Sequence, residues 1–146
     1  MIAVLQRVSE AWVSVNGSNI ARIEQGMMVL IGVQQSDTPD SAFKMAKKLT
    51  SYRIFADEQG KMNLSVKQIS GSLLLVPQFT LAAQTNKGMR PGFSSAAAPE
   101  KGKEIFESFV EQCTKQHRST QSGLFGADME VGLINDGPVT FIFDIT

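Results

Sequence analysis

The stretch Met27-Met28-Val29-Leu30-Ile31-Gly32-Val33 is a continuous apolar run of strand length, and it decides the fold class. A run without polar alternation indicates a strand that is buried on both faces. A second such run, Ser72-Leu73-Leu74-Leu75-Val76, leads directly into Pro77. With helical patterns between and after them, these strands predict one mixed α/β domain.

Two segments predict helices. Ser36-Asp37-Thr38-Pro39 combines a capping side chain with an early proline, and it predicts a helix over Pro39–Tyr52. Its expected buried stripe is Ala42, Phe43, Ala46, Leu49 and Ile54. A second helix is expected from Pro99 to His117, with a buried stripe formed by Ile105, Phe106, Phe109, Val110 and Cys113.

The other elements are shorter. Further strands are expected at Met1–Val8, Ala11–Val15, Ile20–Ile23, Met129–Ile134 and Val139–Ile145. Asn16-Gly17 predicts a hairpin turn, and a turn at Asn135–Pro138 joins the last two strands. Gln84–Ala98 lacks apolar periodicity, and a loop of this length in a compact domain is usually functional or mobile.

The bulk composition narrows the class of protein. The 146 residues fit one domain, and contents of 42% hydrophobic and 19% charged residues are typical of a globular chain. The formal net charge is +0, so no overall basic field indicates a nucleic-acid-binding protein. Candidates for a local phosphate-binding patch are Lys87, Arg90, Lys101, Lys103, Lys115 and Arg118.

The cysteine count and the first residues bear on location. Cys113 is the only cysteine, which excludes an internal disulfide and suits a reducing compartment. Met1–Arg7 lacks the basic start and long apolar run of a signal peptide. No stretch approaches the ~18 apolar residues of a membrane span. We therefore expect a cytoplasmic protein with no membrane partner.

The usual catalytic side chains are scarce. A zinc site built from Cys and His needs three or four such ligands, and the chain has one of each, so we expect no metal or other cofactor. His117 lies at the expected end of the second helix, where a solvated, helix-terminal role is favoured over catalysis. An enzyme of this composition would work through backbone groups, hydroxyls or its substrate.

Two short strings stand out, Pro77-Gln78-Phe79-Thr80-Leu81 and Asn135-Asp136-Gly137-Pro138-Val139-Thr140. The first is either an ordinary strand edge, or a place where the N–H groups of Gln78, Phe79 and Thr80 form an oxyanion hole. The second is a turn, and the residues alone do not decide whether its Gly-Pro bond is cis.

Over its whole length the chain resembles the bacterial D-aminoacyl-tRNA deacylases, whose markers are Ser-Gln-Phe-Thr-Leu and Asn-x-Gly-Pro-Val-Thr. The chain supplies Gln78–Leu81 of the first marker and all of the second. The other matching segments are Met1–Val8, Tyr52–Phe55, Gly60–Leu64, Gly88–Pro91 and Phe125–Met129. Each segment is weak alone, but their order and spacing together are highly specific.

Pro77 is the one departure, because the family typically has Ser there. Proline offers neither an N–H nor a hydroxyl, so any hydrogen bond from that position is lost. A sister branch, the animal-type tRNA deacylases, carries Pro-Gln-Ala-Thr at this point. Phe79 and the intact Gly137–Thr140 agree instead with the D-specific group, so Pro77 bears on rate and substrate range.

The resemblance implies a single α/β domain over residues 1–146, with a mixed, barrel-like sheet and two main helices, that forms a homodimer. It implies hydrolysis of the ester of D-aminoacyl-tRNA, a chiral proofreading step. The cis Gly137-Pro138 of one subunit would enter the pocket of the other. Its carbonyl groups would accept from the α-ammonium group and leave no room for an L side chain. Glycyl-tRNA mischarged on another tRNA has no side chain to reject, so it should enter as well.

The resemblance also implies residue roles. The N–H groups near Gln78, Phe79 and Thr80 would hold the oxyanion. Thr80 would attack covalently, although no base is evident, or, as we favour, the ribose hydroxyl next to the ester assists a water. Alternatives remain for three residues: Phe125 stacks on the terminal adenine or is core, Met129 is a pocket wall or core, and Arg7 braces the Gly-Pro turn or forms a surface ion pair.

Two rival functions stay open. Pro77 suggests a sister-type deacylase that removes L-alanine from a mischarged tRNA. The other rival is a catalytically silent dimer that binds tRNA ends, and the neutral charge of the chain argues mildly against a pure RNA-binding module.

Overall fold

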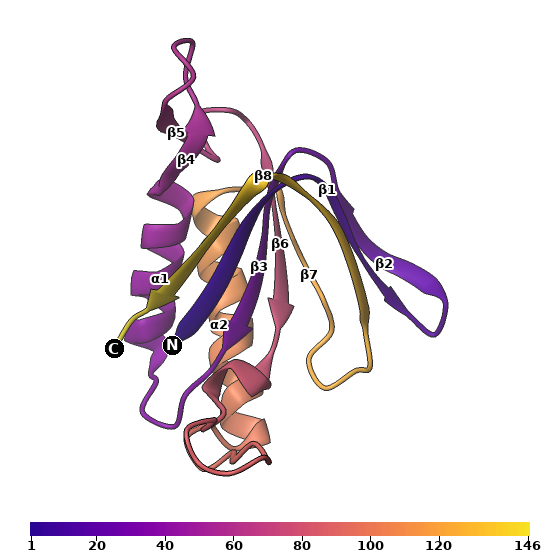
Figure 1. The fold of residues 1–146 in the computed structure, drawn as a ribbon, viewed down its shortest axis with the longest axis vertical. Helices are drawn as coiled ribbons and strands as arrows, with labels where there is room; N and C mark the ends of the chain where they lie inside the picture. The colour runs from indigo at the N-terminus through magenta and orange to yellow at the C-terminus, as the bar shows by residue number, and fades with distance from the viewer.

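The computed structural model describes residues 1–146 as a curved sheet with two helices packed on one face (Figure 1). The strands of the sheet are β1 (Ile2–Val15), β2 (Ser18–Ile23), β3 (Gly26–Gly32), β6 (Ser72–Pro77), β7 (Thr120–Ser122) and β8 (Glu130–Asp144). Their order is β2-β1-β3-β6-β7, and β8 pairs with β1. The remaining elements are β4 (Arg53–Ala56), β5 (Met62–Ser65), the helices α1 (Pro39–Ser51) and α2 (Pro99–Gln116), and the 3-10 helix η1 (Phe79–Ala82).

The sheet curls until it is nearly closed. The first half of β1 pairs with β3 and its second half with β2, while β8 follows β1 along both halves. At the far side, Gln121 of β7 accepts from the N–H of Arg22 in β2 at 3.0 Å and donates to the Arg22 carbonyl at 2.7 Å. These bonds link the two ends of the strand order, so the predicted barrel-like α/β fold is confirmed.

The alternation of side chains along β3 explains its unbroken apolar sequence. Met27, Val29 and Ile31 face the helices and belong to the larger core cluster, which includes both helical stripes. Met28 points to the opposite side, into a smaller cluster inside the curl of the sheet with Val76. A strand between two cores needs apolar residues at every position, as the sequence predicts.

Helix α1 ends one residue before its predicted end, and its buried stripe differs from the prediction. Met45 is buried, whereas Phe43 is 47% exposed and Ile54 lies in β4. Phe43 stands about 100° around the helix from Ala42, which turns it away from the sheet. The N-cap residue is Thr38, whose N–H donates to Ser41 Oγ at 3.2 Å, while the carboxylate of the preceding Asp37 accepts from the buried Met1 ammonium at 2.7 Å.

Helix α2 begins at Pro99 as predicted and ends at Gln116, with His117 as its C-terminal cap. Four of its five predicted stripe residues are buried, and Val110 is half-buried. Neither α-helix combines the length and the hydropathy needed to cross a membrane.

Two strand predictions need correction, and three short strands had no counterpart among the predictions. β1 is one strand of 14 residues, and the expected break near Ser9 is only a shift of register against β8. β8 likewise runs without interruption through Asn135–Pro138, so this string is a bulge within a strand and not a hairpin corner. The short strands β4, β5 and β7 were not predicted, because three or four residues carry little periodicity.

Candidate functional site

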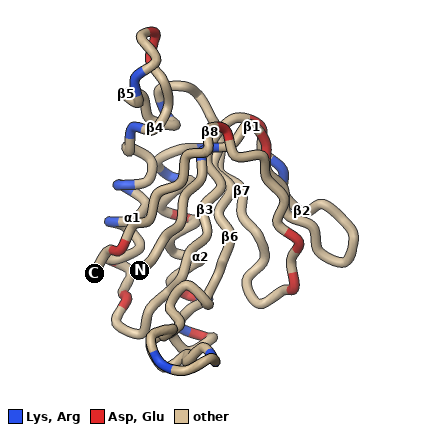
Figure 2. The backbone as a smooth tube through the Cα atoms, viewed as in Figure 1, with Lys and Arg blue, Asp and Glu red and all other residues tan.

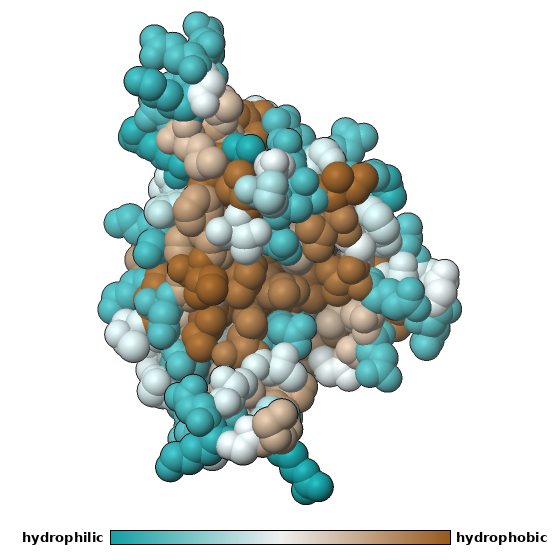
Figure 3. Space-filling view, viewed as in Figure 1, coloured by the Kyte–Doolittle hydropathy of each residue, from teal (hydrophilic) through white to brown (hydrophobic).

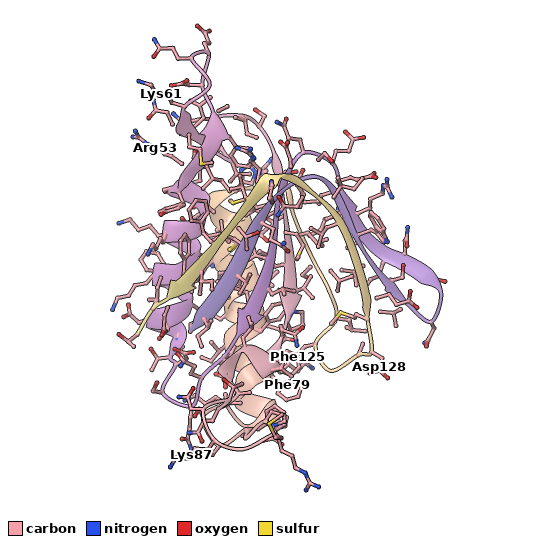
Figure 4. All side chains as sticks on the ribbon, viewed as in Figure 1. Arg53, Lys61, Phe79, Lys87, Phe125 and Asp128 are labelled. Atoms are coloured by element: carbon pink, nitrogen blue, oxygen red, sulfur yellow. The ribbon has the colours of Figure 1, made fainter.

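The string after β6 lies beside a cavity of about 250 Å³. The wall consists of residues from β3, η1, the segment before α2, α2 itself and the Phe125 loop: Ile31, Val33, Gln78, Phe79, Ala97, Pro99, Gly102, Phe106, Phe125 and Gly126. A second hollow of about 330 Å³ shares Gln78, Phe79 and Phe125 with the first and adds Val76, Pro77, Asp128 and Met129. Figure 4 shows Phe79 and Phe125 close together at the end of β6.

The backbone of the string is only partly free. The N–H of Gln78 donates to the Ile31 carbonyl at 2.7 Å and continues the pairing of β6 with β3. The prediction that this N–H faces a ligand is therefore wrong. Phe79 and Thr80 begin η1, and the first N–H groups of a helix have no partner within the helix. An oxyanion hole at this site would therefore use Phe79 and Thr80.

The Thr80 hydroxyl has no acid–base partner. Its Oγ1 accepts from Nε2 of Gln78 at 2.6 Å, and no carboxylate or imidazole bonds to it. A side-chain amide cannot remove a proton from a hydroxyl, so the contact orients Thr80 without activating it as a nucleophile.

Phe125 lies between the two hollows and is half-buried. Its ring centroid is 6.1 Å from that of Phe106 in α2. Gly102 makes room for the ring, because a Cβ atom at this position would approach Phe125 Cζ to 3.2 Å. On the opposite side, Phe79 is 56% exposed and its ring lies 5.2 Å from Phe93. The cavity thus has aromatic walls that are only partly covered.

Met129 and Pro77 close the second hollow. The Met129 sulfur accepts from the N–H of Leu124 at 3.4 Å and covers Gly123, where a Cβ would come within 2.8 Å of it. The same Cβ on Gly123 would lie 3.5 Å from Pro77 Cδ. Met129 is half-buried and lines the hollow while it also packs against the smaller core cluster, so its two predicted roles are compatible.

The Gly137-Pro138 peptide bond is cis, and hydrogen bonds hold it from both sides. Asn135 accepts from the N–H of Val139 at 2.7 Å and donates to its carbonyl at 3.2 Å. Arg7 donates through Nε to the Asp136 carbonyl at 2.8 Å and through another nitrogen to the Ile54 carbonyl at 2.8 Å. Arg7 therefore links the turn to β4 through one carbonyl of each, and its Nε also lies 3.6 Å from the Asp136 carboxylate.

The two strings lie at opposite ends of the sheet within one chain. Pro77 pairs with Ile31, which pairs with Ala3, whereas Asn135 pairs with Val8. Ala3 and Val8 are five residues apart along β1, which corresponds to about 17 Å. A single chain therefore does not bring Gly137-Pro138 to the cavity beside η1.

Two reactive side chains lie outside the site. His117 Nε2 is 2.6 Å from the Gly71 carbonyl, so this residue ties the end of α2 to the chain before β6 and is less solvated than predicted. Cys113 is buried in the core, and burial raises the pKa of its thiol from 9.0 to about 12. No cluster of three or more His, Cys, Asp or Glu side chains is placed to hold a metal ion.

Sequence reasoning missed the far wall of the cavity. Gly102, Phe106 and Ala97 come from the α2 region and line it with Phe125. Gly102 carried a detectable signal, because a glycine inside a helical pattern costs stability and usually has a packing or functional reason. Phe106 belonged to the predicted buried stripe, and nothing in the sequence shows that one side of it faces a cavity.

Comparisons with known proteins find relatives that match nearly the whole chain. The family model described as D-Tyr-tRNA(Tyr) deacylase matches residues 4–144. A protein of Shewanella halifaxensis named D-aminoacyl-tRNA deacylase is 53% identical over 141 residues, 97% of each chain, and one of Citrobacter koseri with the same name is 52% identical over the same share.

Two solved structures share the fold. One, titled c-Myc DNA Unwinding Element Binding Protein, is 39% identical with a TM-score of 0.94, covering 99% of this chain and 98% of the other. The other, titled as a probable eukaryotic D-amino acid tRNA deacylase, has a TM-score of 0.87 with the same coverage, and at 19% identity it shows the fold alone. From sequence and structure together, the chain belongs to the D-Tyr-tRNA(Tyr) deacylase family.

Proposed function

We propose that the chain hydrolyses the ester that joins a D-amino acid to the terminal adenosine of tRNA, and so releases free tRNA and the amino acid. Family membership and the names of its bacterial relatives support this reaction. The observation in the structure that carries it is the aromatic cavity of about 250 Å³, which lies directly beside the free N-terminal turn of η1. Such a cavity can hold the base of the terminal adenosine while the adjacent N–H groups face the ester on the ribose of that nucleotide.

The terminal adenine would occupy this cavity. The half-buried Phe125 lines the cavity, and the exposed Phe79 supplies a second aromatic side chain in its wall. Unstacked bases of RNA are commonly recognised by stacking on aromatic side chains. The ribose and the ester would then lie toward the second hollow, between Pro77 and Met129.

The chemistry would rest on the backbone and on the substrate. The N–H groups of Phe79 and Thr80 would stabilise the oxyanion as it forms, and such donors contribute ~3–4 kcal/mol each in known enzymes. Because the Thr80 hydroxyl bonds only to the Gln78 amide, a covalent role for it lacks a base. The ribose hydroxyl next to the ester would instead assist the attacking water.

We infer that a second copy of the chain completes the site. Val4 of β1 pairs with Leu30 of β3 and with Ile142 of β8, so these residues form an apolar row on the face away from the helices. Ile142 is 72% exposed, and Figure 3 shows apolar surface gathered over this face. An uncovered apolar face is typical of a protein interface.

Two-fold symmetry would also bring the two strings together. The second hollow, lined by Val76, Pro77 and Met129, lies near one end of the open face, and Gly137-Pro138 lies near the other end. An isologous dimer formed through this face would bring the turn of each subunit to the second hollow of its partner. Each dimer would then hold two identical sites.

Chirality would be read by the carbonyl groups of Gly137 and Pro138. They would accept from the α-ammonium group of the amino acid and occupy the space that an L side chain needs. Backbone oxygens held by Asn135 and Arg7 have fixed positions, so selection would not depend on which side chain the amino acid carries. Glycyl-tRNA would also enter, and a cytoplasmic location fits both this substrate and the reduced Cys113.

Single-turnover hydrolysis of matched D-tyrosyl- and L-tyrosyl-tRNA tests the proposal. We expect rapid loss of the D ester only, and loss of that activity in Gly137→Ala, where the new Cβ would lie 2.5 Å from the Val139 nitrogen. Gly60→Ala is the matched control, because it strains a turn with nothing within 4 Å and outside the site. Hydrolysis of the L ester at the same rate would contradict the backbone filter.

Two other outcomes would favour the rival functions. Hydrolysis of L-alanyl-tRNA in preference to D-alanyl-tRNA would identify a sister-type deacylase, and Pro77→Ser would then be expected to shift the preference. Binding of intact aminoacyl-tRNA without any ester loss, even in Pro77→Ser, would indicate a silent binding protein.

A further inference from the structure

A polar hollow of about 340 Å³, separate from the two hollows beside η1, lies in the loop that follows η1. Its wall consists of Gln84, Asn86, Lys87, Arg90 and Gly92, and none of these side chains is apolar. Lysine and arginine carry only donors, and the two side-chain amides offer further N–H groups. A hollow lined in this way is suited to an anion with several acceptor oxygens.

The two cations are not neutralised within the chain. The segment Ala83–Ala98 contains Lys87 and Arg90 and no acidic residue. The six ion pairs of the structure involve neither side chain, whereas Lys44, Lys103 and Lys115 each pair with a carboxylate on their own helix. In a chain of net charge +0 this loop is therefore a local excess of positive charge, at one end of the molecule in Figure 2.

The loop is fixed in place at its base. Gln84 and Gly92 exchange backbone hydrogen bonds of 2.7 and 3.0 Å, and the Gln84 amide donates to the Ser95 hydroxyl at 3.0 Å. These bonds close the segment between them into a compact loop. Lys87 and Arg90 are thus held on a defined scaffold, which lowers the entropy lost when they bind a ligand.

The same loop is attached to the candidate active site. Gln84 follows the end of η1 by two residues, and the Phe93 ring packs 5.2 Å from the Phe79 ring. Figure 4 shows Lys87 at the same end of the molecule as Phe79 and Phe125. A polymer whose terminal base enters the aromatic cavity would have its preceding backbone near this loop.

We propose that Lys87 and Arg90 bind the phosphate groups of the nucleotides that precede the terminal adenosine in the single-stranded 3′ end of tRNA. This inference rests on the proposed function, because it takes the terminal adenosine to occupy the cavity beside η1. Met89 is 99% exposed between the two cations and offers an apolar contact to a base or ribose of the same strand. The loop would supply affinity for RNA without reading its sequence.

The test is binding of a deacylated RNA hairpin with the single-stranded 3′ end of tRNA, measured by fluorescence anisotropy over a series of salt concentrations. The variant is Lys87→Gln with Arg90→Gln. Its matched control is Lys47→Gln with Lys67→Gln, which removes the same charge from two exposed residues without ion pairs, on α1 and before β6. We expect the Kd of the Lys87/Arg90 variant to be at least tenfold higher than that of the wild type, and the Kd of the control to be unchanged.

The salt dependence gives a second readout. Loss of two phosphate contacts to a single strand should reduce the slope of log K against log salt by about 1.4. The kcat/KM value for D-tyrosyl-tRNA should fall at least tenfold more than the value for D-tyrosyl-adenosine, which carries no phosphate. Unchanged affinity and slope would overturn the proposal, as would an equal loss of affinity for a blunt duplex without the 3′ strand.

The outcome is separable from that of the proposed function. Because the hairpin carries no amino acid, its binding is measured without any ester hydrolysis. A wild-type protein that fails to hydrolyse the D ester but still binds the hairpin through Lys87 and Arg90 would remove the deacylase proposal and support the phosphate site. If hydrolysis stays stereospecific and neither substitution changes it, the deacylase proposal is supported and the phosphate site is removed.

Discussion

Arg7 is the side chain from outside the Gly-Pro turn that hydrogen-bonds to it. It donates to the carbonyls of Asp136 and Ile54, which belong to β8 and β4. A planar guanidinium group can reach two carbonyls at once, whereas an ammonium group on a flexible chain holds neither direction. In the proposed site Arg7 would thus be a positioning residue that acts through the turn and does not touch the reacting atoms.

Arg7→Lys should therefore reduce deacylation while it preserves the fold. We expect kcat/KM for D-tyrosyl-tRNA to fall by about 10–100-fold, since a misplacement of 1 Å at a reacting centre has an effect of this size. Arg22→Lys is the control, because Arg22 pairs with Glu10 on the surface away from the cavity. Single-turnover kinetics with circular dichroism would check the result, and equal loss in both variants would contradict the assigned role.

Cys113 gives a prediction for stability against pH. Burial raises the pKa of its thiol to about 12, whereas the unfolded chain has the ordinary value of 9.0. The folded state therefore keeps a proton that the unfolded state loses above pH 9, so this residue lowers the free energy of unfolding between pH 9 and 12 and has no effect below pH 8.

Between pH 8 and pH 10 the loss due to Cys113 should be about 1.4 kcal/mol, the value of one pH unit above the unfolded pKa. Urea unfolding of wild type and Cys113→Ala at both pH values isolates the contribution, because every other group titrates in both proteins. The variant should start less stable, since it leaves a cavity, and should show a shallower decline. Parallel declines would show that the thiol is not buried in solution.

At the scale of the elements, α2 forms part of the cavity and part of the core. One side contributes Ile105, Phe109 and Cys113 to the core cluster, while Gly102 and Phe106 face Phe125. Glycine weakens a helix interior by ~1 kcal/mol relative to alanine. Gly102 thus lowers the stability of α2 at the position where a larger side chain would contact the Phe125 ring.

Gly102→Ala should separate stability from binding. The substitution restores helix propensity, but its Cβ lies 3.2 Å from Phe125 Cζ and pushes the ring into the cavity. We expect an unchanged or slightly higher Tm together with at least a fivefold higher KM for D-tyrosyl-adenosine. Lys103→Ala, on the same helix and exposed, controls for helix propensity. An unchanged KM would show that the base does not occupy this cavity.

At the scale of the whole molecule, the separation of the two strings predicts complementation between inactive subunits. Gly137→Ala would damage the turn, and Phe79→Asp, at an exposed position, would damage the cavity. A heterodimer of these two variants would contain one site with an undamaged cavity and an undamaged turn. We expect it to recover about half of the wild-type activity, because a two-fold dimer has two sites.

Differently tagged subunits, co-expressed and purified over two affinity steps, would provide that heterodimer. Each homodimeric variant should be inactive in the same assay. A heterodimer as inactive as its parents would mean that each subunit uses its own turn, in conflict with the register of β1 and β8.

Local patterns in the sequence were enough to predict the two helices and the two buried strands, whereas the role of the two strings was inferred from the resemblance to a family. Continuous apolar runs, a proline at the start of each helix and the Asn16-Gly17 turn are read over a few residues. Local patterns also mislead at two points: Phe43 fits the spacing of the buried stripe but is 47% exposed, and the turn residues Asn135–Pro138 lie within the continuous strand β8.

Only the folded chain shows which side chains line the cavity and which backbone N–H groups are already hydrogen-bonded. The pairing of β6 with β3 uses the Gln78 N–H, and the pairing of β8 with β1 carries Gly137 about 17 Å from that level. Both results depend on the register between strands that lie far apart in the sequence. That register follows from how whole faces of the sheet are buried, and no short string of residues contains it.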